Sequence, residues 1–115
     1  MSHRVVVVIR EDPLKSHRAV EALRIALGLS TGSNPPTVVL LDEAPRLLGP
    51  DIDEIVDVEI LEKHLPVLKD LEIPFVVRFG ARAQYGVDSG FAVQEQSDAQ
   101  ISALVAAADR VLTFG

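Results

Sequence analysis

The sequence contains no cysteine. Disulfide bonds, thiolate metal sites and a cysteine that acts as a nucleophile or carries a persulfide are therefore excluded. Two nucleotide-binding motifs are also missing, because no G-x-x-x-x-G-K-[ST] loop occurs and no G-x-G-x-x-G follows the first apolar run. Dedicated nucleotide binding through either motif is unsupported.

Positive charge and long apolar runs are scarce as well. The chain carries 11 Lys and Arg against 17 Asp and Glu, a net charge of −6, which argues against binding to nucleic acid or to an anionic membrane. The first apolar run, Val5 to Ile9, is shorter than a signal-peptide core of about 7–15 residues or a membrane span of about 20. We therefore expect a cytoplasmic protein that binds neither nucleic acid nor membrane.

The length and composition are those of one globular domain, residues 1–115. The chain is 48% hydrophobic and 24% charged, which suffices to build a core. A domain of this size is only marginally stable alone, and oligomerisation is one common remedy.

Buried strands alternate with amphipathic helices along the chain. Strands are predicted at 5–9, 37–41, 75–77, 91–94 and 111–114, and the unbroken apolar runs are typical of parallel strands covered on both faces. Helices are predicted after Asp12 and Pro13 (as N-cap and first helical residue), over about 59–71 with a kink or restart at Pro66, and after a capping box of Ser97 and Gln100. One helical turn is possible at 81–85. The pattern predicts a doubly wound, mostly parallel five-stranded α/β sheet with helices on both faces.

Polar side chains follow the first three strands, where the carboxyl ends of parallel strands meet. The candidate ligand-binding residues are Arg10, Asp12, Asp42, Arg78, Arg82 and Tyr85. Guanidinium groups present fixed donor forks to carboxylate or phosphate, so one interpretation is a pocket for a small anion. In the other interpretation, which we favour, the arginines pair with Glu11, Asp12, Asp42 or Glu43 and hold loops together.

Other site chemistry has little support. His3, His17 and His64 show no ligand spacing, and the acidic stretch at 51–57 lacks the central glycine of a calcium loop. A phospho-receiver domain would need an aspartate where Arg78 stands and a lysine near Thr113. We expect no metal, no cofactor and no catalytic residue. An enzyme with Glu11, Asp12 or Asp42 as base is the least favoured hypothesis.

Four segments together resemble the DsrE/DsrF-like family of intracellular sulfur-relay proteins (the TusBCD and DsrEFH type). They are REDPLKSHRAVEALRIALGL (10–29), TVVLLDEAPRLL (37–48), LEIPFVVRFGARAQYGV (71–87) and ADRVLTFG (108–115). The resemblance covers nearly the whole chain. It implies a small flavodoxin-like α/β domain that forms dimers, trimers or dimers of heterotrimers.

In active members of that family, a persulfide-carrying cysteine ends the third strand, eight residues before a glycine. Counting back from Gly86 gives Arg78. The resemblance therefore implies a non-catalytic member, a structural or docking component. Its expected partners are copies of itself (dimer, trimer or hexamer) or DsrE/F/H-like subunits, and the alternative is a module that binds a small anion. Candidate interface residues, for each of which the core is an equal alternative, are Leu47, Leu48, the segment 52–60, Phe79, Tyr85 and Phe91.

Overall fold

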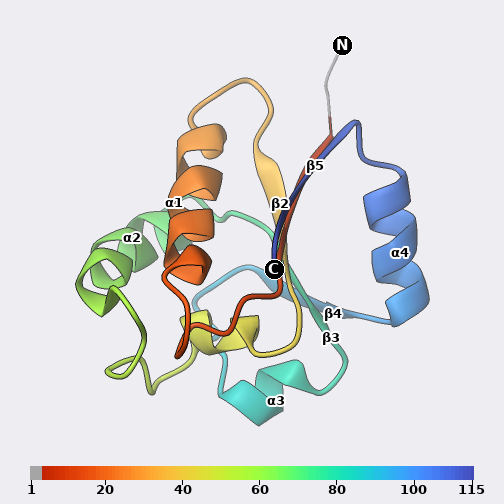
Figure 1. Ribbon diagram of the computed structural model, residues 1–115. Helices are drawn as coiled ribbons and strands as arrows, with labels where there is room; N and C mark the ends of the chain where they lie inside the picture. The colour runs from red at the N-terminus through yellow and green to blue at the C-terminus, as the bar shows by residue number, and fades with distance from the viewer. Residues whose placement is uncertain (1–3) are drawn as a thin grey trace.

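The computed structural model describes residues 4–115, so His3 lies outside the described residues. Five strands, β1 (Val5–Ile9), β2 (Pro36–Leu40), β3 (Phe75–Arg78), β4 (Val93–Gln96) and β5 (Arg110–Phe114), form one sheet. The helices are α1 (Arg18–Ser30), η1 (Ala44–Leu48, a 3₁₀ helix), α2 (Val58–Asp70), α3 (Ala81–Tyr85) and α4 (Asp98–Ala106). Figure 1 shows their arrangement.

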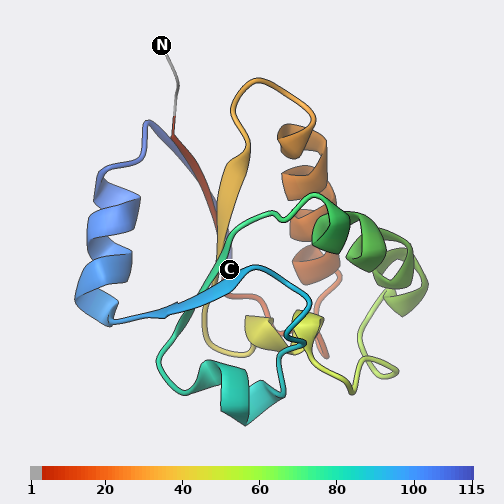
Figure 2. The same ribbon diagram turned by 180° about the vertical axis from the view of Figure 1, so that it is seen from behind.

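The sheet is wholly parallel, with the strand order β4-β3-β2-β1-β5. The chain steps from β1 to β4 in one direction and then returns to the far side of β1. Because parallel crossovers are right-handed, this reversal sends α4 to the face opposite α1 and α2. Both views show that separation (Figures 1 and 2). The predicted doubly wound α/β fold is thus confirmed.

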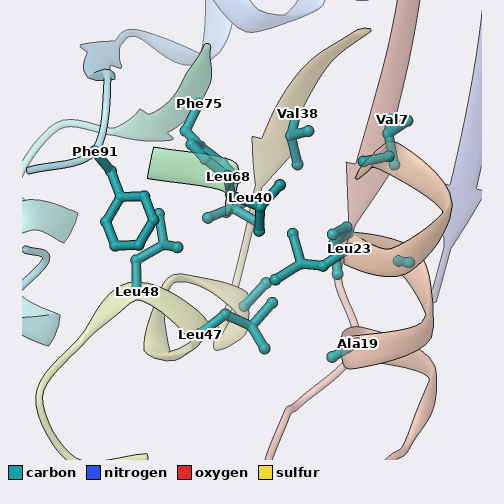
Figure 3. Close-up of a cluster of buried hydrophobic side chains, with 14 of the residues drawn as sticks. Val7, Ala19, Leu23, Val38, Leu40, Leu47, Leu48, Leu68, Phe75 and Phe91 are labelled. Atoms are coloured by element: carbon teal, nitrogen blue, oxygen red, sulfur yellow. The ribbon is translucent and has the colours of Figure 1, made fainter. Parts of the chain in front are cut away.

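Each face of the sheet buries its own set of apolar side chains. Val7, Val38 and Leu40 point toward α1 and η1 and pack with Leu23 and Leu47 in the larger core (Figure 3). Alternate residues of the same strands face α4 in the smaller core, which contains Val6, Val8, Val39, Leu41, Val76 and Ile101. Burial on both faces explains why these strands read as unbroken apolar runs.

The predicted start of the first helix is wrong. Asp12 caps a separate turn, in which its carboxylate accepts from the Leu14 N–H at 2.9 Å. The Pro13 carbonyl accepts from the Val56 N–H at 3.0 Å, so it is not bonded to the His17 N–H as a continuous helix would require. In an Asx turn and in a helix N-cap alike, a side-chain oxygen accepts from a backbone N–H nearby, so the two cannot be distinguished by the identity of Asp12 alone.

Other boundaries follow the predictions closely. α2 runs through Pro66 as one helix, and α3 occupies the predicted turn. The capping box of α4 is present, since Ser97 Oγ accepts from the Gln100 N–H at 3.1 Å and Gln100 Oε1 accepts from the Ser97 N–H at 2.8 Å. The fourth strand begins at Val93 rather than at residue 91.

Three of the candidate interface residues belong to the hydrophobic core. Leu47, Leu48 and Phe91 are buried, and the Phe91 ring meets Phe75 edge to face at 5.9 Å. Phe79 differs, because it is 68% exposed. No helix among residues 4–115 is long and apolar enough to cross a membrane.

Candidate functional site at the carboxyl ends of β2 and β3

Three of the six predicted site residues come together at the carboxyl edge of the sheet. Asp42, Arg78 and Tyr85 line a hollow of about 330 Å³. Its other walls are Leu40, Leu41, Glu43, Pro45, Phe79, Ala81 and Gln84. In open parallel sheets, this edge is where ligands usually bind.

The turn that leaves β2 has an unusual backbone. Asp42 has a φ of 55°, in the left-handed region that costs an L-residue roughly 1–2 kcal/mol and that aspartate tolerates better than most. The Tyr85 hydroxyl donates to the Asp42 carbonyl oxygen at 3.0 Å. This hydrogen bond connects α3 to the turn that follows β2.

Arg78, the last residue of β3, lies between two carboxylates. Its Nε donates to Asp98 Oδ1 at 2.9 Å, and its Nη1 lies 3.6 Å from Asp42 Oδ1. Arg78 thus links the exit of β2 to the first residue of α4. All three side chains are largely exposed, so solvent screens both pairs. For Arg78, this geometry matches the interpretation in which the arginine pairs with nearby carboxylates and holds loops together.

Tyr85 is half-buried between charged neighbours. The Arg46 guanidinium lies 5.3 Å from the centre of the Tyr85 ring, and Arg46 Nε donates to Glu43 Oε2 at 2.7 Å. Burial, followed by the negative charge of Glu43, raises the pKa of Tyr85 above its ordinary value. The phenol therefore remains a hydrogen-bond donor at neutral pH.

The other three predicted residues lie outside this hollow. Arg82 Nη1 donates to the Val93 carbonyl oxygen at 3.0 Å and so ties α3 to the start of β4. Arg10 is exposed at the end of β1, where its N–H bonds to the Phe114 carbonyl at 2.8 Å. Asp12 belongs to the turn that follows. Two interstrand spacings of about 4.8 Å separate β1 from β3, so their ends do not share one pocket.

Sequence reasoning missed Asp98 and Arg46. Asp98 lies two residues beyond Gln96, which pairs with Arg78 in the β3–β4 register, so it could be found only once that pairing was known. Arg46 is three residues after Glu43 on η1, a spacing that favours an ion pair on a helix. No group of three His, Cys, Asp or Glu side chains within residues 4–115 is arranged to hold a metal ion.

Comparisons with known proteins support the fold. The chain is similar to the crystal structure of the ychN protein from E. coli, with a TM-score of 0.75 over 99% of this chain and 100% of that chain. The sequence identity is 18%, so the likeness concerns the fold. No family model and no curated protein matches the chain.

Proposed function

We propose that the chain is a non-catalytic DsrE/F-like protein that serves as a structural or docking component of a sulfur-relay assembly. The observation that carries this proposal is Arg78. The residue ends β3 eight positions before Gly86, where the resemblance to active family members calls for the persulfide cysteine. A guanidinium is always protonated and is no nucleophile.

The surroundings of Arg78 favour a structural role. Asp42 and Asp98 already neutralise the guanidinium, so the residue joins three elements without any ligand. The likeness of fold to the ychN protein, over the full length of both chains, supports the same proposal.

Phe79 offers a docking contact beside Arg78. Its side chain is 68% exposed at the wall of the hollow, so a partner that covers the hollow would bury the ring, and aromatic side chains contribute large apolar areas to interfaces. The partner that we propose is a DsrE/F/H-like subunit that carries the missing cysteine.

Co-expression tests this proposal. The chain is produced together with cysteine-bearing DsrE/F-like subunits, and the native mass of the purified material is measured by light scattering. We expect a defined hetero-oligomer that Phe79→Ser weakens and that Leu14→Ser does not, since Leu14 is exposed on the turn after β1. A chain that joins no relay subunit would refute the proposal.

A second candidate function is the binding of a small anion in the hollow. The observation in its favour is the left-handed Asp42 beside Arg78 and Tyr85, because strained backbone gathers at functional sites. An anion would have to displace Asp42 and Asp98 from Arg78. Sulfate or phosphate should then raise the melting temperature, since a ligand of the native state stabilises it. Arg78→Ala should abolish the shift while Arg10→Ala, outside the hollow, keeps it; a shift that survives Arg78→Ala rules this pocket out.

A further inference from the structure

α2 carries a mostly apolar stripe beside its core face. Leu61 and Leu68 are fully buried against the sheet. The stripe consists of Ile60, His64, Val67 and Leu71, the last being the residue that follows the helix with helical dihedral angles. Ile60 is 44%, Val67 41% and Leu71 51% exposed. His64 is half-buried, and its Nε2 is buried without a hydrogen-bond partner, so neighbouring elements leave the three apolar residues of the stripe open.

The spacing of the stripe is that of a coiled-coil seam. Its residues are separated by four, three and four positions, as the a and d positions of a heptad are. Ile60 and Val67 then occupy d, and His64 and Leu71 occupy a. Side chains at such positions interlock with a second helix of the same kind.

Two charged residues border the stripe on its outer edge. Lys63 and Asp70 both fall at g in this heptad frame, and both are exposed. Within residues 4–115, neither forms an ion pair. The e positions on the other edge are the buried Leu61 and Leu68, which leaves the g positions to set the orientation of a partner helix.

We propose that two copies of this chain pair through α2 in antiparallel orientation about a twofold axis. In that arrangement a faces d, so Ile60 meets the partner subunit's Leu71, and His64 meets the partner subunit's Val67. The g positions also face each other, which places Lys63 beside the partner subunit's Asp70.

The twofold axis makes every contact occur twice, so the surface is complementary to itself. A parallel pair would instead place Lys63 opposite a buried leucine and would leave the charges unmatched. The charge pattern therefore selects both the occupant, a second copy of this chain, and its direction.

A charge exchange between two variants tests the pairing. The protein is studied over a dilution series by sedimentation velocity. The wild type should dimerise reversibly. Lys63→Glu and Asp70→Lys should each raise the dimer dissociation constant about tenfold, because two attractive pairs become repulsive.

An equimolar mixture of the two variants should dimerise again, since each then presents the charge that the other lacks. Glu62→Lys, which changes a charge on the opposite side of α2, is the matched control and should leave the mass unchanged. Val67→Glu, which places a charge in the seam itself, should give a monomer.

A wild type that stays monomeric at every concentration would overturn the pairing. A dimer that persists in Val67→Glu, or a variant mixture that remains monomeric, would overturn it too. None of these measurements involves Phe79 or a relay subunit, so failure here is distinct from failure of the proposed function.

Discussion

At the scale of single residues, Arg78 shows how neighbours limit what a position can do. Asp42 and Asp98 hold its guanidinium from two sides. The same carboxylates would oppose a negative charge at this position. A thiolate placed there would be destabilised by both of them.

The thiol of an Arg78→Cys variant should therefore react slowly with electrophiles, and the substitution should not restore a sulfur carrier. We expect its pKa to exceed the ordinary value of about 8.5, because two carboxylates disfavour the thiolate. The pH dependence of alkylation by iodoacetamide measures it, with Ser102→Cys on the exposed face of α4 as control. Adding Asp98→Asn should lower the pKa. A thiol at Arg78→Cys that ionises below the control would contradict this account.

Tyr85 can be followed alone, because the chain has one tyrosine and no tryptophan. Absorbance of the phenolate should show a pKa above the ordinary value of about 10, owing to burial and to Glu43. Glu43→Gln should bring it closer to 10. Since the pKa is raised by folding, this group's contribution to stability is complete below about pH 10 and is lost as the pH rises further. A Tyr85 pKa at or below 10 in the wild type would show that the ring is not half-buried beside Glu43.

At the scale of elements, α4 was foreseen best and α1 least well. The capping box of Ser97 and Gln100 is a local pattern, and both of its hydrogen bonds form. The start of α1 depends on a distant contact, since Val56 takes the carbonyl of Pro13. Local patterns can be read from sequence, whereas a helix start that is decided by a neighbour far along the chain cannot.

Ser97→Ala should reduce the free energy of unfolding by about 1 kcal/mol, because the cap of α4 loses its acceptor. Urea denaturation measures the change. Ser102→Ala is the matched control, since it removes an exposed serine inside the same helix and should be neutral or slightly stabilising. Equal effects of the two substitutions would mean that the cap contributes nothing.

The Lys69–Asp88 pair should stabilise the loop before β4 to an extent that depends on pH. Asp88 accepts from Lys69 Nζ and from the Gly90 N–H, each at 2.8 Å. These bonds lower the pKa of Asp88, the one to Lys69 most. A lowered pKa stabilises the fold above about pH 4, and the stabilisation is lost as the pH falls below that value. Asp88→Asn should therefore be less stable than the wild type at pH 7 and equal to it in strong acid; Asp53→Asn, on an exposed loop, should match the wild type at both.

At the scale of the whole molecule, strand order decided which predicted site residues meet. Unbroken apolar runs that alternate with helical patterns were enough to predict a parallel sheet and its ligand-binding edge. They contain no information on the order of the strands, in which β2 lies between β1 and β3, so Arg10 and Asp12 were grouped with Arg78. Likewise, the core and an interface were equal alternatives for Leu47 and Phe91, because the burial of a side chain depends on which other parts of the chain pack against it.

The same topology covers the two faces of the sheet unequally. α1, α2 and η1 share the larger core, whereas α4 alone covers the other face and has one buried apolar residue, Ile101. Local opening requires the least free energy where few apolar contacts must be broken. α4 should therefore open before the central strands do.

Hydrogen exchange can test this order. Amides of α4 should exchange faster than those of β1 and β2, and Ile101→Ala should accelerate α4 while leaving the central strands protected. Leu23→Ala, in the larger core, removes a fully buried side chain at a cost of about 2–5 kcal/mol and should accelerate exchange throughout. If Ile101→Ala also accelerated β1 and β2, α4 would be part of one cooperative unit with the sheet.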